Sequence, residues 1–237
     1  MDDWQGDFND VSTYSISVII PTLNEAQNIE RLLSYLHQLD STLELIVSDA
    51  GSADNTVEQA KYVSKVVHSA RGRGIQMNEG AKAATGDVLW FIHADCFPPS
   101  DSVNAIRQAL IDPEVVGGGF EYSLNHPAFR FRVIEVLSNR KNRMLKLLYG
   151  DMGIFVRREI FNQMGGYEEI PLMEDMDFSK RLKQYGKITI LPQRMTTSAR
   201  RWIEDGFVLN SIRSWLFQIA WALGASPYKL AKWYRFK

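Results

Sequence analysis

The chain contains almost no cysteine, since Cys96 is its single one in 237 residues. One cysteine excludes an internal disulfide and a zinc site built from cysteines, so we expect a reducing, cytoplasmic compartment. Long apolar runs are missing as well. The nearest approach to one, residues 207–224, is interrupted by polar side chains such as Asn210 and Arg213. A membrane-spanning helix needs roughly 18 or more apolar residues in succession, so none is predicted.

Neither sign of charge is in excess, because 27 lysines and arginines face 28 aspartates and glutamates. A dedicated nucleic-acid-binding protein normally carries a basic excess, so we expect no nucleic-acid partner. Residues 1–14 contain four aspartates and no lysine or arginine. A secretory signal begins with basic residues followed by an apolar run, so this segment is predicted to be a flexible acidic tail.

The overall composition, 45% hydrophobic and 23% charged, is typical of a folded soluble protein. Basic residues nevertheless gather in two segments. Residues 126–147 hold six basic side chains and one acidic, and residues 194–237 hold eight basic and two acidic. These segments predict either solvated helix faces or surfaces that attract an anionic lipid or a phosphorylated substrate.

Apolar segments and amphipathic segments alternate in the first half of the chain. Strands are predicted at residues 15–21, 44–50, 65–69 and 87–93. Helices are predicted at residues 25–39, from Asp54 onward with Asp54 as its cap, and at 74–84. This alternation predicts an α/β fold with a doubly wound, mostly parallel sheet and helices on both faces.

The second half of the chain is less regular. Helices are predicted at residues 101–110, 129–148 and 175–185, and strands at 115–120, 153–157 and 187–191. Apolar residues recur at helical spacing within residues 207–224. We therefore expect one domain over residues 15–205 and a helical C-terminal extension, residues 206–237, that packs on it.

In an open α/β sheet, ligands bind outside the carboxyl ends of the strands. Polar residues follow three of the predicted strands at this edge. They are Thr22, Asn24 and Glu25 after Pro21, then Asp49, Ser52 and Asp54, and finally His93 and Asp95 on either side of Ala94. Because carboxylates are costly to bury without a cation or a donor, their convergence indicates a ligand site. For Glu25 or Asp54 taken alone, a simple role at a helix start is equally open.

These segments, with others further along, resemble the motifs of family 2 glycosyltransferases with the GT-A fold. The matching residues keep the family's order over residues 15–205: they are 21–25, 49–56, Asn78, Gly80, 86–87, 93–95, 150–151, 165–167, 174–175 and 198–202. The His-Ala-Asp form at residues 93–95 resembles a small bacterial branch of unassigned substrate. The resemblance implies a Rossmann-like sheet with a nucleotide-binding half, residues 15–97, and an acceptor half, residues 98–205.

The donor implied by this resemblance is a UDP- or GDP-sugar. The residue that matches Asp49 accepts a hydrogen bond from the base in this family, and the region of Asn24 and Glu25 contacts the nucleoside. Arg71 or Arg73 would approach the base or the phosphates. The other residues that we place around the donor are Pro21, Thr22, Ser52, Asp54, Asn78 and Ala94.

A divalent metal is also implied, because an Asp-x-Asp motif holds one against the diphosphate in this family. Here His93 replaces the first aspartate, and Asp95 matches the second. We expect Asp95 to be a direct ligand of Mn²⁺ or Mg²⁺. His93 would serve Mn²⁺, which tolerates imidazole, or would instead hydrogen-bond the ribose or a phosphate.

The acceptor hydroxyl must lose a proton as the new bond forms, and a carboxylate within reach of it can act as general base. By resemblance Asp175 is this base, and Glu174 contacts the acceptor or orients Asp175. Both stand at the start of a predicted helix, where the dipole favours anions, so a role as helix-start carboxylates stays open. One base and no enzyme nucleophile predict an inverting displacement.

Two further motifs resemble the region around the acceptor and the diphosphate. Gly150 and Asp151 match an acceptor-side carboxylate motif, and Arg200, Arg201 and Trp202 match a basic-aromatic motif. An arginine here would bind the diphosphate while Trp202 stacks on a sugar. Trp202 as a core residue is an equal alternative.

Other functions stay open at this point. A nucleotidyltransferase of related fold would need an early glycine- and arginine-rich loop, which residues 15–27 lack. A catalytically weak nucleotide-sugar-binding or scaffold protein would explain His93, although Asp95 and the acidic pair at 174–175 argue against it. No motif specifies the acceptor, and lipid-linked molecules are among the candidates. The aromatic and basic C-terminal helices would cover the sheet, form a homodimer or rest on the inner face of a membrane.

Overall fold

The computed structural model describes residues 14–204 and 206–234, with only the backbone described at residues 201 and 207–209. The predicted tail at residues 1–14 lies outside the described residues except for Tyr14. Strands and helices alternate in the first half, as predicted. The strands are β1 (Ile16–Thr22), β2 (Glu44–Asp49), β3 (Lys65–His68) and β4 (Val88–Phe91). The helices are α1 (Ile29–Leu39), α2 (Thr56–Ala60) and α3 (Arg73–Ala83).

Two helix starts differ from the prediction. Helix α1 begins at Ile29 and not at Glu25, because Asn24 has a left-handed backbone (φ 56°) and the carbonyl of Glu25 closes a turn. Helix α2 begins at Thr56, and its cap position is Asn55. Asp54, one residue before this cap position, accepts a hydrogen bond from the Thr56 N–H at 3.0 Å. Polar contacts in the loops, which periodicity does not reveal, therefore set both helix starts.

The second half adds four strands and several helices. The strands are β5 (Cys96–Phe97), β6 (Val115–Leu124), β7 (Phe155–Arg157) and β8 (Lys187–Thr197). The helices are α4 (Ser102–Ala109), α5 (Phe129–Leu145), the 3₁₀ turn η2 (Gly150–Met152), α6 (Arg158–Gln163), α7 (Glu174–Leu182), α8 (Arg200–Glu204), α9 (Phe207–Ala222) and α10 (Pro227–Trp233). Strands β6 and β8 run past the predicted ends at residues 120 and 191, because they pair with each other as far as Leu124 and Thr197.

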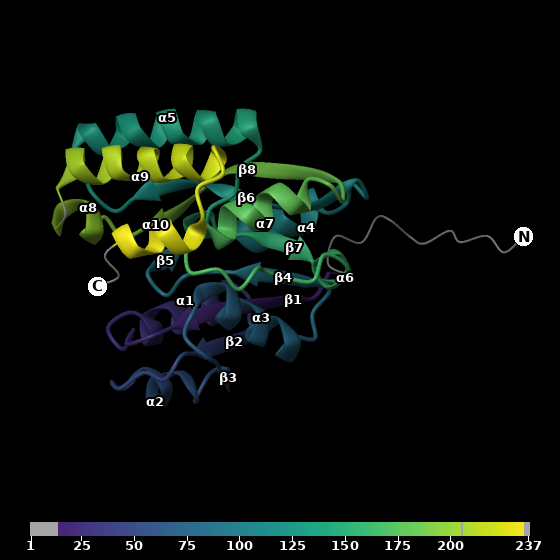
Figure 1. Ribbon diagram of the computed structural model, residues 1–237. Helices are drawn as coiled ribbons and strands as arrows, with labels where there is room; N and C mark the ends of the chain where they lie inside the picture. The colour runs from purple at the N-terminus through teal and green to yellow at the C-terminus, as the bar shows by residue number, and fades with distance from the viewer. Residues whose placement is uncertain (1–13, 205, 235–237) are drawn as a thin grey trace, which may run out of the picture.

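The strands of the described chain form one eight-stranded sheet in the order β3-β2-β1-β4-β7-β6-β8-β5 (Figure 1). Strands β3, β2, β1 and β4 are parallel, and so are β6 and β8. Strand β7 is antiparallel to both of its neighbours, and β5 is antiparallel to β8. The predicted α/β sheet is confirmed. Its register sets Thr22 opposite Asp49, so the ends of β1 and β2 meet at one edge.

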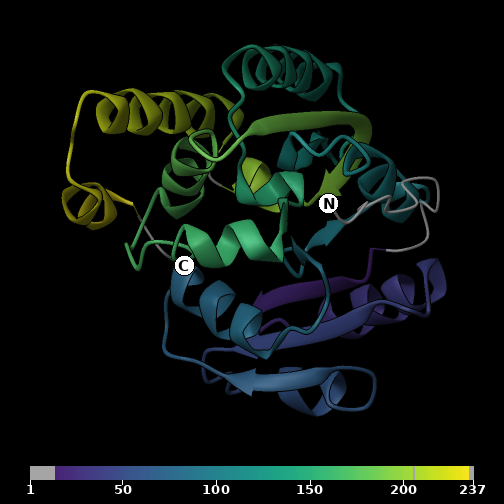
Figure 2. The same cartoon turned by 90° about the vertical axis from the view of Figure 1, so that its right-hand side faces the viewer.

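Hydrophobic side chains are buried on both faces of this sheet. Helices α1 and α4 cover one face, where Leu36 and Ile106 are fully buried. Helices α3, α6 and α7 cover the other face with side chains such as Met77 and Phe178. Figure 2 shows α1 and α3 on opposite sides of the sheet. The two layers hold the carboxyl ends of the strands in place.

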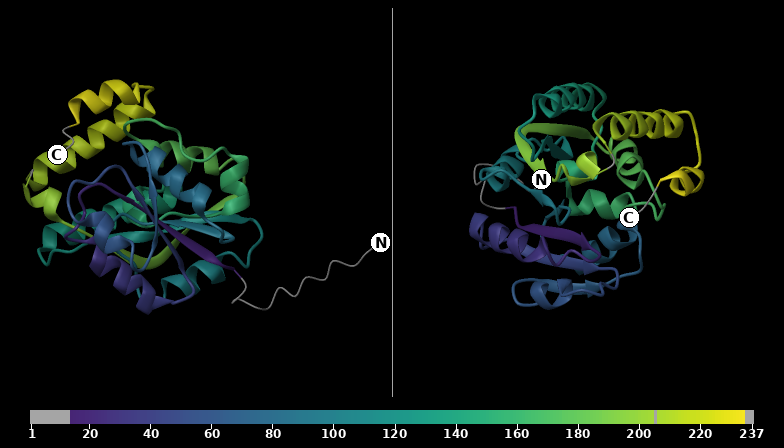
Figure 3. Two further views of the ribbon diagram at one scale, coloured as in Figure 1. Left: turned by 90° about the horizontal axis from the view of Figure 1, so that it is seen from below. Right: turned by 90° about the vertical axis from the view of Figure 1, so that its left-hand side faces the viewer.

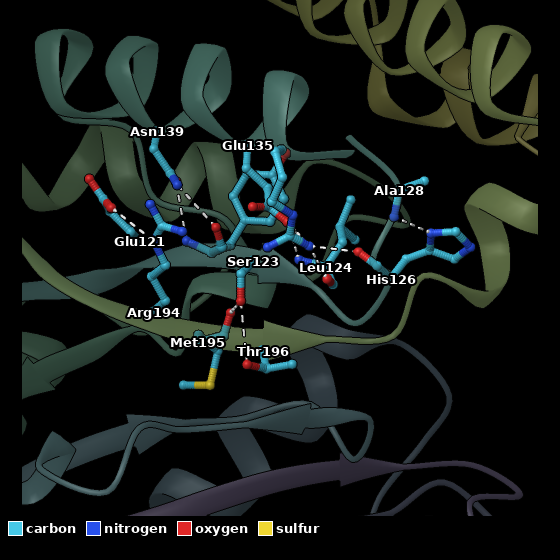
Figure 4. A network of polar contacts seen from close by, with 12 residues as sticks. Glu121, Ser123, Leu124, His126, Ala128, Glu135, Asn139, Arg194, Met195 and Thr196 are labelled. Atoms are coloured by element: carbon cyan, nitrogen blue, oxygen red, sulfur yellow. Dashed lines mark hydrogen bonds and ion pairs between the residues drawn. The ribbon is translucent and has the colours of Figure 1, made fainter. Parts of the chain in front are cut away.

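Helix α5 lies beside the second half of β6 and turns polar side chains toward it (Figure 4). The Asn139 side chain donates to the Tyr122 carbonyl at 3.0 Å and accepts from its N–H at 3.1 Å. Glu135 accepts a hydrogen bond from the Leu124 N–H at 2.6 Å. Because β6 pairs with β7 only at residues 117 and 118, these side chains satisfy backbone groups that no strand reaches on that side.

Helix α9 runs next to α5, and the chain then turns into α10 (Figure 3). The Lys141 Nζ of α5 donates to Gln218 Oε1 of α9 at 2.7 Å. Among the described residues, no helix combines the length and the apolarity needed to cross a bilayer.

Candidate active site

Asp49 holds together the loops that follow β1 and β2. Its carboxylate accepts hydrogen bonds from Thr22 Oγ1 at 3.0 Å, from the N–H groups of Gly51 and Ser52 at 2.9 and 2.8 Å, and from the Ser52 hydroxyl. Burial by itself raises the pKa of Asp49, but the hydrogen bonds from Ser52, Thr22 and Gly51 outweigh it and lower the pKa. Asp49 is therefore a buried carboxylate with both oxygens engaged inside the protein.

Asn24 joins the same two loops from the other side. Its N–H donates to Ser52 Oγ at 2.8 Å, and its Oδ1 accepts from the Ala53 N–H at 2.8 Å. Glu25 comes next along the chain. Burial raises the pKa of Glu25, and the nearby charge of Asp95 acts in the same direction. Residues from the ends of β1, β2 and β4 therefore converge, as the sequence predicted.

Gln76 is a buried residue at this edge that no motif indicated. Its Nε2 donates to the carbonyls of Thr22 and Ser48 at 2.8 and 3.1 Å. One side chain of α3 thereby satisfies a carbonyl at the end of each of two strands and fixes them relative to each other. Pro21 is buried in β1 beside Thr22.

Two other residues that we expected around the sugar donor, Arg71 and Asn78, have no contact with these loops among the hydrogen bonds that the structure describes for them. Arg71 is exposed in the loop before α3. Asn78 is bonded to the backbone of Tyr167, donating to its carbonyl and accepting from its N–H, both at 2.8 Å. The motifs at residue 78 and at residues 165–167 therefore form one structural clamp, in which the Asn78 amide is already used.

His93, Asp95 and Cys96 follow β4, and one ligand atom of each lies within 4.8 Å of the others. Ala94, between them, is buried in the core. Burial raises the pKa of the Cys96 thiol, which donates to Thr197 Oγ1 at 3.3 Å. The imidazole of His93 and the carboxylate of Asp95 are the two ligands that the motif offers to a divalent cation. This donor set fits Mn²⁺ better than Mg²⁺, which prefers oxygen.

Gly150 leaves room for the His93 ring. A Cβ at Gly150 would lie 2.4 Å from His93 Cε1 and 2.6 Å from His93 Nε2, so no other residue fits there without displacing the ring. The Gly150 N–H also donates to Asp175 Oδ2 at 3.0 Å. One glycine thus brings a histidine from the end of β4 and an aspartate from α7 to the same place.

Glu174 and Asp175 begin α7, and Arg73 of α3 lies against them. The Arg73 Nε is 3.0 Å from Oε1 of the buried Glu174. Burial raises the pKa of Asp175 to about 7, the charge of Glu174 adds to the increase, and Arg73 opposes it. Arg73, which the sequence suggested for the donor, is therefore placed beside the two carboxylates of α7.

Asp151 lies close enough to Asp95 and Arg73 for their charges to act on it. Burial raises the pKa of Asp151 to about 6, and the charge of Asp95 adds to the increase, while Arg73 and Lys141 oppose it. Lys141, which in the sequence is only one basic residue among several, donates to the Tyr149 hydroxyl at 3.2 Å. We use the term carboxylate cluster for four residues: Asp95, Asp151, Glu174 and Asp175.

The basic-aromatic motif, residues 200–202, has one residue exposed to solvent, Arg200, and one packed on the core, Trp202. Arg200 is exposed at the start of α8, and its charge acts on Glu25. The side chain of Arg201 lies outside the described residues. Trp202 packs on the core and meets the Phe131 ring edge to face, with 6.5 Å between centroids. The structure thus favours the core role for Trp202.

Comparison with known proteins adds to this geometry. The family model described as Glycosyl transferase family 2 matches residues 17–166, more than half of the chain. The chain belongs to this family. Dolichol-phosphate mannosyltransferase of Pyrococcus furiosus is 33% identical over 119 residues, which are 45% of this chain and 33% of that protein. Glycosyltransferase AglE of Haloferax volcanii is 26% identical over 170 residues, 64% of this chain and 55% of that protein. This family 2 chain spans about a third to a half of these relatives.

Solved structures share its fold. Mannosyltransferase PcManGT from Pyrobaculum calidifontis, in complex with GDP-Man and Mn²⁺, has a TM-score of 0.60 and 23% identity, covering 78% of this chain and 57% of that one. Glucosyl-3-phosphoglycerate synthase from Mycobacterium tuberculosis, in complex with Mg²⁺ and UDP, has a TM-score of 0.59 and 22% identity, covering 83% and 76%. The GT-A fold implied by the motifs is confirmed.

The contact between Gly150 and His93 predicts that a methyl group added at residue 150 destabilises the protein only when the imidazole ring of His93 is present. Gly150→Ala should lower the free energy of unfolding by about 1–3 kcal/mol, because its Cβ overlaps the imidazole. In a His93→Ala background the same substitution should cost much less. Urea unfolding of the four proteins measures this coupling. Strictly additive effects would show that the two residues do not touch.

Proposed function

We propose that the protein is a glycosyltransferase that moves a sugar from a UDP- or GDP-sugar to a hydroxyl acceptor, with inversion at the anomeric carbon. The observation that carries this proposal is the carboxylate cluster. It sets Asp95 and His93 on one side and a base candidate, Asp175, on the other, joined through Gly150. Membership of glycosyl transferase family 2 supports the reaction class.

The donor is proposed to bind over residues 15–97, at the edge formed by the ends of β1, β2 and β4. Asp49 already accepts several hydrogen bonds, so its contribution is to shape the loop that meets the base. Asn24 and Ser52 tie this loop to β1. The structures similar to this chain include complexes with GDP-Man and with UDP, which supports a nucleotide-diphosphate donor.

Asp95 and His93 would hold a divalent cation, Mn²⁺ or Mg²⁺, as the complexes of two neighbours with these ions suggest. When bound, the cation neutralises charge that develops on the leaving diphosphate. Arg200 would add positive charge from α8, on the side of Glu25.

Asp175 is proposed as the general base. With a pKa of about 7 it is partly ionised at neutral pH and basic enough to accept the proton of a hydroxyl group. The N–H groups of Gly150 and Met176 hold its two oxygens at 3.0 and 2.7 Å. The ion pair of Glu174 with Arg73 fixes the start of α7 beneath it. A single displacement assisted by one base inverts the anomeric carbon.

The acceptor is proposed to lie over residues 98–205, beside Asp151. Lys141 and Tyr149 lie near Asp151 and are linked to the C-terminal extension through Gln218. A lipid-linked acceptor is one candidate, because a relative is named for the lipid dolichol phosphate.

Asp175→Asn should retain donor binding and lose turnover by about 10²–10⁴-fold, because an amide cannot accept the proton. Calorimetry with UDP- and GDP-sugars measures binding, and release of nucleoside diphosphate measures turnover. Asp177→Asn is the matched control, since Asp177 lies on the same helix and bonds Arg181 at 2.6 Å. Full turnover in Asp175→Asn would remove Asp175 as the base.

The pH profile should identify the same group. Protonated Asp175 cannot act as a base, so kcat/KM should fall as the pH decreases below about 7. Arg73 lowers this pKa, so Arg73→Gln should move the acidic limb to higher pH. Arg71→Gln, which changes an exposed arginine in the loop just before α3, should leave the limb in place. An unshifted limb in Arg73→Gln would contradict this assignment.

Asp95→Ala tests the cation site. Nucleotide binding should weaken more in Mn²⁺ than in the presence of a chelator, because the substitution removes the only carboxylate ligand that we assign. Titration of UDP and GDP into wild type and variant, each with and without Mn²⁺, gives four affinities for each nucleotide. Equal losses in both conditions would refute the metal role of Asp95.

A further inference from the structure

Helix α5 exposes an apolar stripe. The stripe recurs at helical spacing, with exposed fractions from 42% to 83%: its residues are Phe129, Val133, Val136, Leu137 and Met144. On the inward side of the helix, Glu135 and Asn139 are committed to the backbone of β6 (Figure 4). A helix that uses polar side chains against the sheet leaves apolar ones outside, the reverse of an ordinary surface helix.

Helix α9 carries a second such stripe. Its exposed apolar residues have exposed fractions from 47% to 83%: they are Ile212, Trp215, Leu216, Ile219 and, just past the helix end, Leu223. The two helices are in contact, because Lys141 of α5 bonds Gln218 at 2.7 Å and its Nζ lies 5.7 Å from the centre of the Trp215 ring. Figures 1 and 3 show them side by side. These two stripes together are the α5/α9 face.

The exposed charged residues of helices α5, α9 and α10 are all basic. In sequence, helices α5, α9 and α10 contain one acidic residue, Glu135, which is buried and lies 2.9 Å from Arg132. The exposed basic residues of α5 and α10 are Arg130, Arg140, Arg143, Lys229 and Lys232, of which Arg143 pairs with Glu121 of β6 at 2.8 Å. Single exposed apolar side chains are ordinary, but two adjacent stripes bordered by positive charge indicate an interaction surface.

We propose that the α5/α9 face docks on a bilayer surface that contains anionic phospholipid. The apolar side chains would enter the boundary between headgroups and acyl chains, and the basic ones would lie against the headgroup phosphates. A second copy of the same face would oppose like charges, which disfavours a symmetric dimer. Docking would set the bilayer beside Lys141, whose charge reaches Asp151. The proposed docking on a bilayer does not depend on the proposed glycosyl transfer.

Flotation of the full chain with phosphatidylcholine vesicles, with and without phosphatidylglycerol, tests this proposal. We expect binding to the anionic vesicles at low salt, and about tenfold or more weaker binding to the neutral ones. High salt should weaken the attachment, because it screens the exposed charges.

Variants on the face should weaken this binding. Leu137→Ser and Leu216→Ser should each do so about tenfold by removing apolar area from the bilayer, and Arg140→Glu by about tenfold or more. All three side chains are exposed, so thermal unfolding should match wild type. Controls come from the turn after α2 and from β3, at the opposite end in Figure 1: Tyr62→Ser and Lys65→Glu should bind like wild type.

Absence of wild-type binding to anionic vesicles at low salt would overturn the proposal, and so would equal losses in the control variants. A wild-type dimer that Leu216→Ser dissociates in sedimentation would also overturn it, because a second copy would then cover the face. Cleavage of nucleotide sugars in solution should be unchanged in the face variants, which separates this test from those of the proposed reaction.

Discussion

Burying several carboxylates next to one another is costly, because each loses hydration and repels its neighbours. The protein offsets part of this cost with Arg73, which pairs with Glu174 at 3.0 Å, and with Lys141 on the opposite side. The remainder appears as raised proton affinity, with a pKa of about 6 at Asp151 and about 7 at Asp175. The crowding that opposes folding therefore also supplies a carboxylate that titrates near neutral pH, which general-base chemistry requires.

The surrounding contacts hold this cluster in a fixed geometry. Gln76 bonds the ends of β1 and β2, and Asp49 holds the loop between β2 and α2. Gly150 leaves room for the His93 ring, and its N–H donates to Asp175. Most of these contacts involve backbone groups of regular elements. A site built this way is organised before any ligand arrives, so binding need not order it.

Strand β6 imposes a second constraint, in the half of the sheet away from β1 and β2. Within the part of the chain that the structure describes, no strand pairs with β6 on its β7 side beyond residue 118, and Asn139 and Glu135 from α5 bond its backbone there. Polar groups on the inner face of α5 leave its apolar residues outside, next to those of α9. The charged and apolar surface that we propose to dock on a bilayer is thus a consequence of the short strand β7, which leaves the second half of β6 to α5.

The sequence by itself determined the alternation of strands and helices, because apolar periodicity is a local property, and it determined the family, because the motifs are short contiguous segments. It missed the full length of β8, whose last residues are held by pairing with β6. It also indicated no role for Gln76, and it assigned Arg73 to the donor. Only the tertiary structure set Arg73 of α3 against Glu174 of α7. Burial and neighbours distant along the chain control proton affinity, so only the fold decided which carboxylates have a raised pKa.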